Sequence, residues 1–254
     1  MTKPSKARIR LSFERAAPSY DQAATVQRRI CESLFSQLSP SQPPQRLLDA
    51  GCGTGYGLAL LKHQFPLAET LGLDLSPAML ERTPQGTLNL GGDLEHLPLA
   101  DDSIDLYWSS LAVQWCDLGK ALHEARRVLR SNGTLAIASL GPATFSELRL
   151  AFSGIDNHQH TLEFHAPEEI STLARQAGFA TVHLQKSIET AHYADFKTLL
   201  RAVKAVGANQ LGSGRRTSLL SRAAFERAAA AYEACRSPAG LPLTYDVITL
   251  IAQK

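Results

Sequence analysis

The stretch R-L-L-D-A-G-C-G-T-G, from Arg46 to Gly55, decides the fold of this 254-residue chain. It begins as a short apolar strand that ends in the carboxylate of Asp49, and Gly51, Gly53 and Gly55 follow. Glycines at a strand-to-helix turn let the backbone adopt positive φ and approach a ligand closely. The helix predicted next, over 56–64, offers unpaired N–H groups at its start. The pattern therefore predicts a nucleotide-type pocket.

A second carboxylate narrows the identity of the ligand. Asp74 ends another predicted strand, about one strand and one helix after Asp49, and an acid at that place can accept both hydroxyls of a ribose. The glycines follow G-x-G-x-G instead of the dinucleotide pattern G-x-G-x-x-G. Asp49 would repel a pyrophosphate but attract an ammonium group. Together, the two acids and the three glycines favour S-adenosylmethionine as the cofactor, with NAD second. The alternative interpretation is a tight turn with a surface acid and no ligand.

The rest of the chain alternates strands and helices, which predicts an α/β fold with a parallel sheet. We expect residues 1–44 to form a loose tail over 1–12 and a helical cover over 17–38, and residues 45–254 to form the main domain. Two helices, at 195–208 and 218–235, interrupt the last pair of strands as an insertion over about 195–236. Strands are predicted near 46–50, 70–75, 88–91, 104–109, 134–140, 181–188 and 245–252, and further helices near 77–82, 118–130 and 167–177.

Bulk properties exclude several classes of protein. A net charge of +2 is too small to imply nucleic-acid binding, and no apolar run reaches the roughly 18 residues that span a bilayer. The basic N-terminus lacks a following apolar stretch, so we expect no secretory signal. The four cysteines are scattered without metal-ligand spacing. They indicate reduced thiols in a cytoplasmic protein without a bound metal.

Longer motifs carry a resemblance to a known family. L-D-A-G-C-G-T-G with the later L-G-L-D-L-S-P-A-M-L resembles motif I and the second-strand acid of class I S-adenosylmethionine-dependent methyltransferases. The run S-L-A-V-Q-W-C (110–116), the segment F-E-R-A-A-P-S-Y-D-Q-A-A (13–24) and L-P-L-T-Y (241–245) are similar to the malonyl-[acyl-carrier protein] O-methyltransferases of biotin synthesis. This resemblance implies a Rossmann-like, mostly parallel seven-stranded sheet with helices on both faces and an antiparallel last strand.

The resemblance also implies roles for individual residues. Asp93 would bind the adenine amino group, the Leu94 backbone N–H a ring nitrogen, and Leu75 and Met79 would flank the adenine, although Met79 could equally fill the core. Tyr20 and Gln27 from the cover would lie near the ligand. Together with Asp49, Gly51, Gly53, Gly55 and Asp74, these residues and Leu111 form the expected cofactor site, and Gln114 and Trp115 line the acceptor side.

A carboxylate acceptor needs no general base because it is ionised at pH 7. It does need a partner for its charge, and Arg201 is the candidate clamp. The segment 195–236 holds eight Lys/Arg and three Asp/Glu, which suits an acidic partner. Lys204, Arg215 and Arg216 are candidates for the phosphopantetheine phosphate and the acidic carrier protein.

The expected activity is methylation of the free carboxyl of malonyl-acyl carrier protein, which yields S-adenosylhomocysteine. Esterification would let the chain enter apolar elongation pockets, because a buried carboxylate is costly. The alternatives are another small-molecule methyltransferase, such as a quinone C-methyltransferase or a trans-aconitate-type carboxyl methyltransferase, and a cofactor-binding module without turnover. The sequence leaves open the oligomeric state, the choice of carrier protein or coenzyme A thioester, and how strictly malonyl is preferred over longer diacids.

Overall fold

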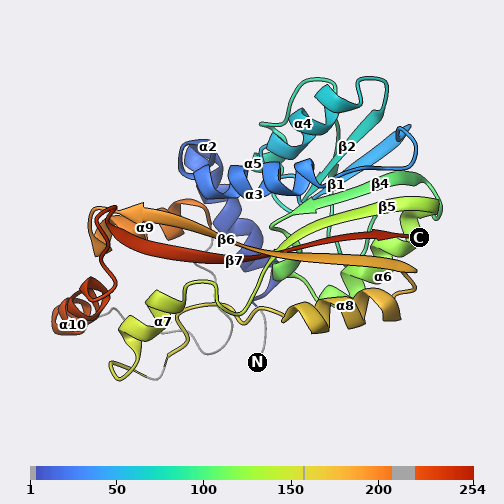
Figure 1. Cartoon of the computed structure of the whole chain (residues 1–254). Helices are drawn as coiled ribbons and strands as arrows, with labels where there is room; N and C mark the ends of the chain where they lie inside the picture. The colour runs from blue at the N-terminus through green and yellow to red at the C-terminus, as the bar shows by residue number, and fades with distance from the viewer. Residues whose placement is uncertain (1–3, 157, 208–220) are drawn as a thin grey trace.

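Seven strands form one sheet in the order β3-β2-β1-β4-β5-β7-β6 (Figure 1). The computed structural model describes residues 4–156, 158–207 and 221–254. Strands β1 to β5 pair in parallel, whereas β7 is antiparallel to both β5 and β6. The predicted fold class is therefore confirmed. The strands are β1 (Arg46–Ala50), β2 (Glu69–Asp74), β3 (Leu88–Gly91), β4 (Ile104–Ser110), β5 (Leu129–Leu140), β6 (Thr181–Tyr193) and β7 (Leu241–Gln253).

Helices cover both faces of the sheet because successive strand residues point to opposite sides. Leu47 packs into one core cluster with residues of α3 and α4, and Leu48 packs into a second cluster with α6 and α8. Both leucines are fully buried. The helices are α1 (Lys6–Ala16), α2 (Tyr20–Ala23), α3 (Thr25–Ser36), α4 (Tyr56–Gln64), α5 (Pro77–Leu80), α6 (Leu118–Val128), α7 (Ser146–Phe152), α8 (Pro167–Gln176), α9 (Phe196–Ala205) and α10 (Arg222–Glu233), with 3-10 turns η1 (Ala17–Ser19) and η2 (Val113–Trp115).

The expectation of a loose tail over residues 1–12 is wrong from Lys6 onward. These residues form α1, in which Ile9 is 2% exposed and Phe13 meets the edge of the Trp115 ring, with 5.8 Å between the ring centroids. Ile9, Phe13 and Ala16 follow the spacing of one helix face. Basic residues between them conceal this apolar stripe in the sequence. The cover over the sheet thus includes α1 as well as α2 and α3.

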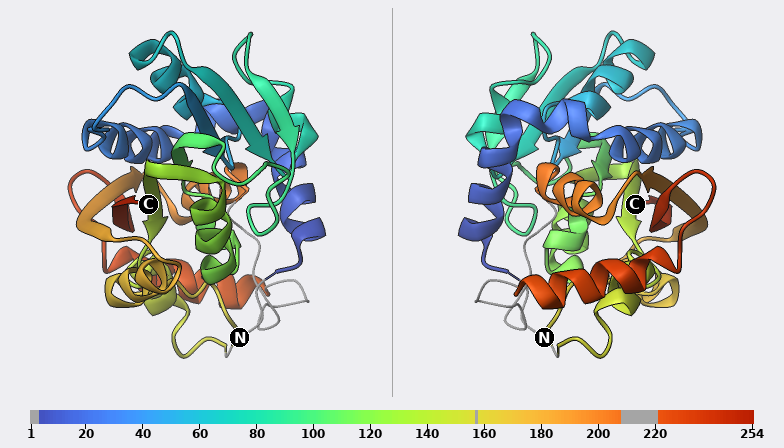
Figure 2. Two further views of the ribbon diagram at one scale, coloured as in Figure 1. Left: turned by 90° about the vertical axis from the view of Figure 1, so that its right-hand side faces the viewer. Right: turned by 90° about the vertical axis from the view of Figure 1, so that its left-hand side faces the viewer.

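The end of the chain also departs from the predicted boundaries. Strands β6 and β7 pair without interruption from Thr181 opposite Gln253 to Tyr193 opposite Leu241, so both are longer than expected. In Figure 1 they extend far beyond the other strands toward α9 and α10, which lie between them in the sequence. Helix α7, which the sequence did not predict, packs against α10 at the same end of the molecule (Figure 2).

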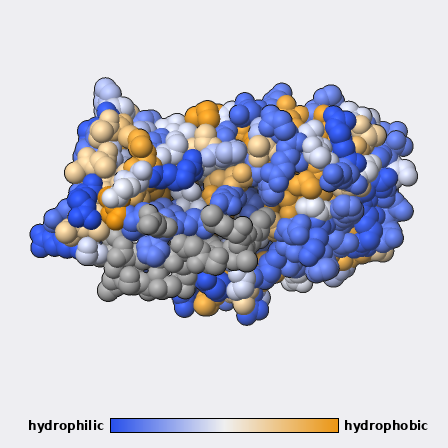
Figure 3. All heavy atoms as spheres, turned by 90° about the horizontal axis from the view of Figure 1, so that it is seen from below, coloured by the Kyte–Doolittle hydropathy of each residue, from blue (hydrophilic) through white to orange (hydrophobic). Residues whose placement is uncertain are grey.

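Within the described ranges, no helix combines the length and apolar character needed to cross a bilayer. Hydrophobic residues appear on the face in Figure 3 as separate groups among hydrophilic ones. The most exposed large hydrophobic side chains of the described residues lie apart in the fold, Leu67 in the turn between α4 and β2 and Leu150 on α7.

Candidate functional site

The glycine loop after β1 is built from left-handed backbone. Gly51, Gly53 and Gly55 have φ values of 79°, 55° and 87°, which only glycine adopts without strain. The Gly51 N–H donates to the Leu73 carbonyl at 2.7 Å and thereby ties the loop to β2. A Cβ added to Gly51 would lie 2.2 Å from the Cβ of Ala112. The loop therefore passes too close to its neighbours for any side chain at this position.

Asp74, at the end of β2, is bonded to the same loop. Its Oδ2 accepts the Gly53 N–H at 2.9 Å, and its Oδ1 accepts the Ser76 N–H at 2.8 Å. Burial raises the pKa of this carboxyl group, and the backbone hydrogen bonds from Ser76 and Gly53 oppose that rise. Each carboxylate oxygen keeps a second lone pair for a ligand donor. Asp74 lies outside the linings of the two cavities described below, so its role toward ligand hydroxyls stays a prediction.

Asp49 has fewer interactions than Asp74 to offset the burial of its carboxylate. It is 3% exposed, and within the described residues no hydrogen bond or ion pair reaches its carboxylate. Burial, followed by the charge of Asp74, raises its pKa to about 8. The indole Nε1 of Trp108, which lines the same cavity, is also buried without a hydrogen-bond partner. A cationic ligand group beside Asp49 would supply the missing counter-charge, so these residues fit the ammonium end of S-adenosylmethionine.

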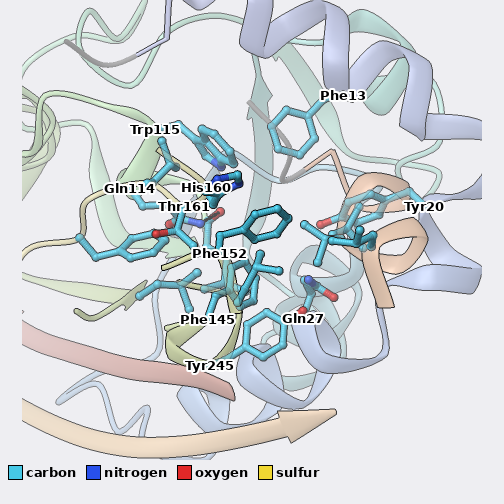
Figure 4. A pocket seen from close by; sticks show the side chains of 18 residues that line it. Phe13, Tyr20, Gln27, Gln114, Trp115, Phe145, Phe152, His160, Thr161 and Tyr245 are labelled. Atoms are coloured by element: carbon cyan, nitrogen blue, oxygen red, sulfur yellow. Dashed lines mark hydrogen bonds between the residues drawn. The ribbon is translucent and has the colours of Figure 1, made fainter. Parts of the chain in front are cut away.

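Two cavities meet beside this loop. The smaller, about 60 Å³, is lined by Asp49, the glycine loop and residues of the cover. The larger, about 220 Å³, has mostly aromatic and aliphatic walls. Tyr20, Gln27 and Leu111 line both. Figure 4 shows Tyr20 and Gln27 in the wall of the larger cavity. A reactive group at the inner end of a ligand in the first cavity would therefore face the second.

The cover is bonded directly to the loop that it encloses. Asp21, next to Tyr20, accepts a hydrogen bond from the Thr54 hydroxyl at 2.7 Å. Thr54 stands between Gly53 and Gly55 in the glycine loop. The smaller cavity is consequently closed on one side by the N-terminal segment.

Two further predicted residues lie in the larger cavity. Gln114 donates from Nε2 to the Leu111 carbonyl at 2.7 Å, and its Oε1 is buried without a hydrogen-bond partner. Trp115 forms part of the same wall and contacts Phe13 of α1. Leu111 itself has a positive φ of 57°, an uncommon conformation for a branched side chain. The segment after β4 is thus held in a specific conformation where the two cavities join.

The residues expected around the adenine lie outside both cavity linings. Met79 is 1% exposed and Leu94 4% exposed, while Leu75 is half-buried. Asp93 accepts a hydrogen bond from the Lys6 ammonium at 2.9 Å. The role of Asp93 in binding the adenine stays a prediction. One of its carboxylate oxygens already accepts from Lys6 of α1.

Lys6 occupies a cluster of acidic and thiol groups that could otherwise hold a metal ion. The ligand atoms of Asp93, Glu95 and Cys116 lie within 4.8 Å of one another. The Lys6 ammonium lies 2.6 Å from the Glu95 carboxylate and 3.4 Å from the Cys116 sulfur. Because the ammonium already pairs with both carboxylates, we interpret the cluster as an anchor for α1 and not as a metal site.

The basic residues expected at the acceptor side are placed differently. Arg201 and Lys204 are exposed on α9, and neither belongs to the lining of the larger cavity. Their helix contributes Leu200 and Val203 instead. The structure therefore does not bring the predicted clamp into this cavity, because Arg201 lies on another side of α9. Arg215 and Arg216 fall outside the described residues.

Sequence reasoning also missed one wall of the cavity. Phe145, Phe152, His160, Thr161 and Phe164 come from α7 and the irregular segment after it, where no element was predicted. The only signal was the density of aromatic and histidine residues between 145 and 165. Tyr245 of β7 completes this side.

Comparison with known proteins shows which proteins the chain resembles in sequence and in fold. A family model described as "Methyltransferase domain" matches residues 48–137. The chain is 64% identical to a malonyl-[acyl-carrier protein] O-methyltransferase of Dechloromonas aromatica over 100% of its own length and 96% of that protein. It is 42% identical to one of Laribacter hongkongensis, over 96% and 87% of the two chains. The crystal structure of a SAM-dependent methyltransferase of Thermotoga maritima, described as a possible histamine N-methyltransferase, superposes with a TM-score of 0.58 at 20% identity, covering 96% of this chain and 99% of that one.

The sheet order, the glycine loop after β1 and the acid after β2 are those of the class I methyltransferases, whose cofactor is S-adenosyl-L-methionine. Within that class, the similarity over nearly the full length of the chain identifies one family. The chain belongs to the malonyl-[acyl-carrier protein] O-methyltransferase family.

Proposed function

We propose that this enzyme esterifies the free carboxyl group of a malonyl thioester carried by an acyl carrier protein, as a step in the synthesis of the pimeloyl part of biotin. The observation that carries the proposal is the junction of the two cavities at Tyr20, Gln27 and Leu111. It connects the charged cavity around Asp49 to an apolar cavity of a size suited to a short acyl group.

The chemistry requires alignment and the exclusion of water more than proton transfer. When bound, S-adenosyl-L-methionine supplies an electrophilic methyl group: an acceptor oxygen bonds to its carbon while the carbon–sulfur bond breaks, the electron pair stays on sulfur, and no proton is released. The ionised acceptor carboxylate needs no general base. The aromatic walls of the larger cavity keep water away from this reaction.

Neutral donors in the wall of the larger cavity can orient the acceptor carboxylate. Burial is the main cause that raises the pKa of both Tyr20 and Tyr245, so their hydroxyl groups stay protonated and can donate. A guanidinium held against the carboxylate would bind it more strongly but would also weaken its nucleophilicity. Hydroxyl donors therefore suit this reaction, and they offer an alternative to the Arg201 clamp expected from the sequence.

The carrier protein is the proposed form of the acceptor. Exposed Arg201 and Lys204 lie on α9 beside the helix positions that line the cavity, where positive charge would attract an acidic carrier. We place the reaction in the cytoplasm. In agreement, the four cysteines are free thiols, three of them buried.

The deciding experiment incubates malonyl-acyl carrier protein and malonyl-coenzyme A separately with the enzyme and S-adenosyl-L-methionine. Mass spectrometry should find one added methyl group on the malonyl unit, with faster turnover of the carrier protein. Turnover of a quinone or of trans-aconitate in its place would assign another acceptor. Cofactor binding by calorimetry without methylation of any of these acceptors would indicate a binding module.

A further inference from the structure

A third cavity continues, on the side of α7, from the larger of the two cavities described above, which we call the acceptor cavity. It measures about 450 Å³ and shares with the acceptor cavity the residues Phe152, His160, Thr161, Leu162 and Phe164. At its other end the acceptor cavity joins the smaller cavity around Asp49, which we call the cofactor cavity, through Tyr20 and Gln27. In Figure 4, His160 and Thr161 lie across the acceptor cavity from Tyr20. The three cavities therefore follow one another in series.

The lining changes character along this series. The acceptor cavity is mostly aromatic and aliphatic, whereas the third cavity adds Arg149, Asp156, Gln159 and Glu163. A malonyl thioester changes in the same order: its acyl end is short, and the pantetheine arm beyond the sulfur carries two amide groups and a hydroxyl group. Polar walls can pair with such groups where apolar walls cannot.

His160 stands in the wall between the two cavities and is held in one orientation. Its Nε2 lies 2.8 Å from the Asp156 carboxylate, and its ring stacks on Phe152 with centroids 3.7 Å apart and planes 13° from parallel. The described residues leave Nδ1 without a hydrogen-bond partner. With Nε2–H donated to Asp156, Nδ1 is an acceptor, and it suits an amide N–H of the arm.

From this series we infer that the third cavity is the subsite for the amide-bearing pantetheine arm of the acceptor. The arm lies between α7 and the residues 158–164, passes His160, and places its acyl end at the junction with the cofactor cavity. This inference rests on the proposed function and adds the route by which the acceptor enters.

The test fills the third cavity without touching the other two. Ser153 lines the third cavity, is exposed, and has no side-chain hydrogen bond within the described residues. Ser153→Trp should raise KM for malonyl-pantetheine about tenfold or more, because the arm loses its space. KM for a short acceptor, the methyl thioester of malonate, should stay within about twofold, and so should the dissociation constant for S-adenosylhomocysteine by calorimetry.

Leu150→Trp is the matched control. Leu150 lies on α7, is 68% exposed and does not line the third cavity, so the same bulky group there should leave KM for both acceptors unchanged. The inference is overturned if Ser153→Trp leaves KM for the long acceptor unchanged, or raises KM for both acceptors equally. Methylation of malonyl-acyl carrier protein by the wild type would preserve the proposed function in either case. If the wild type methylates the carrier protein but not malonyl-pantetheine, the inference fails alone, and if it methylates none of the three acceptors, the proposed function fails with it.

Discussion

The carboxylates of Asp49 and Asp74 lie at the ends of adjacent parallel strands, yet the described residues give hydrogen bonds only to Asp74. The backbone of the glycine loop thus orients one acid and leaves the other for a ligand. The charge of Asp74 further disfavours ionisation of Asp49. The free enzyme therefore holds a buried acid that gains a counter-charge when the cofactor binds.

Cofactor affinity should depend on pH through Asp49. Because its pKa is about 8 in the free enzyme, binding of an ammonium group must first remove a proton at lower pH. Affinity for S-adenosylhomocysteine should rise about tenfold per pH unit below that value. It should fall again at higher pH as the ligand amino group loses its own proton. Calorimetry between pH 6 and 9 measures this.

Asp49→Asn should separate the rise of affinity at acidic pH, the acidic limb, from its fall at alkaline pH, the alkaline limb. The variant has no carboxyl proton to lose, so the acidic limb should disappear while the alkaline limb remains. Affinity at pH 8 should be lower than that of the wild type, because the counter-charge is gone. An acidic limb that persists in the variant would show that another group controls it.

The stability of the cofactor-free enzyme should decrease with rising pH. The folded-state pKa of Asp49, about 8, lies above its ordinary value of 3.8, so the folded protein retains a proton that the unfolded chain releases. Stability therefore falls between about pH 4 and 8 and then levels. The melting temperature should drop from pH 6 to pH 8.5, less steeply in Asp49→Asn. If the two proteins show equal slopes, Asp49 does not carry the effect.

Gly51 and Gly53 should differ in their tolerance of alanine. Both have positive φ, which disfavours alanine in each case. A Cβ on Gly51 would also collide with Ala112, whereas nothing lies within 4 Å of one on Gly53. Gly51→Ala should therefore destabilise the protein by about 2–4 kcal/mol, and Gly53→Ala by about 1 kcal/mol.

A second substitution tests whether the collision is the cause. Ala112→Gly removes the Cβ that Gly51→Ala would meet, so the double variant should regain the part of the loss that exceeds that of Gly53→Ala. Urea denaturation of the four proteins gives the coupling energy. Simple additivity of the two changes would refute the steric explanation.

The Lys6 ammonium should hold α1 on the sheet. Lys6→Met keeps the length of the side chain but leaves Asp93 and Glu95 without their counter-charge. Because the pair is partly exposed, the loss should be about 1 kcal/mol, and amide exchange over 6–16 should become about fivefold faster. Arg10→Met is the control, since Arg10 is 55% exposed and its ion pair among the described residues is with Glu14 of the same helix. Equal exchange in both variants would contradict an anchoring role.

Local signals were enough to predict the part of the site that backbone geometry builds. Strand-end acids and glycines indicated that Asp49, Asp74 and the loop lie together, because the carboxyl ends of parallel strands meet at one edge. Their roles in cofactor binding stay predictions. The helix over Phe196–Ala205 was also predicted, but the rotation of that helix about its axis was not. Successive helix residues point about 100° apart, so Leu200 faces the cavity and Arg201 does not.

The remaining wall of the acceptor cavity has no local signature. His160 and Thr161 reach it from an irregular segment whose position depends on contacts with distant residues, such as the stacking of His160 on Phe152. Helix α1 was hidden for a different reason, since its apolar stripe is short and interrupted by arginines. In both cases tertiary packing selects a conformation that propensity alone does not.

Arg201→Ala should show whether Arg201 binds the acceptor carboxylate or helps the carrier protein to dock. Arg201 is exposed and lies outside the acceptor lining, so turnover and KM for the short methyl thioester of malonate should change by less than about twofold. Arg201→Ala with Lys204→Ala should raise KM for malonyl-acyl carrier protein several-fold at low salt, because exposed charges mainly assist the encounter with an acidic partner. Added salt should bring the wild type toward the variant. Lys120→Ala, at an exposed site on α6, should leave both acceptors unaffected. A loss of turnover on the short acceptor in Arg201→Ala would instead show that the arginine reaches the reacting carboxylate, as the sequence first indicated.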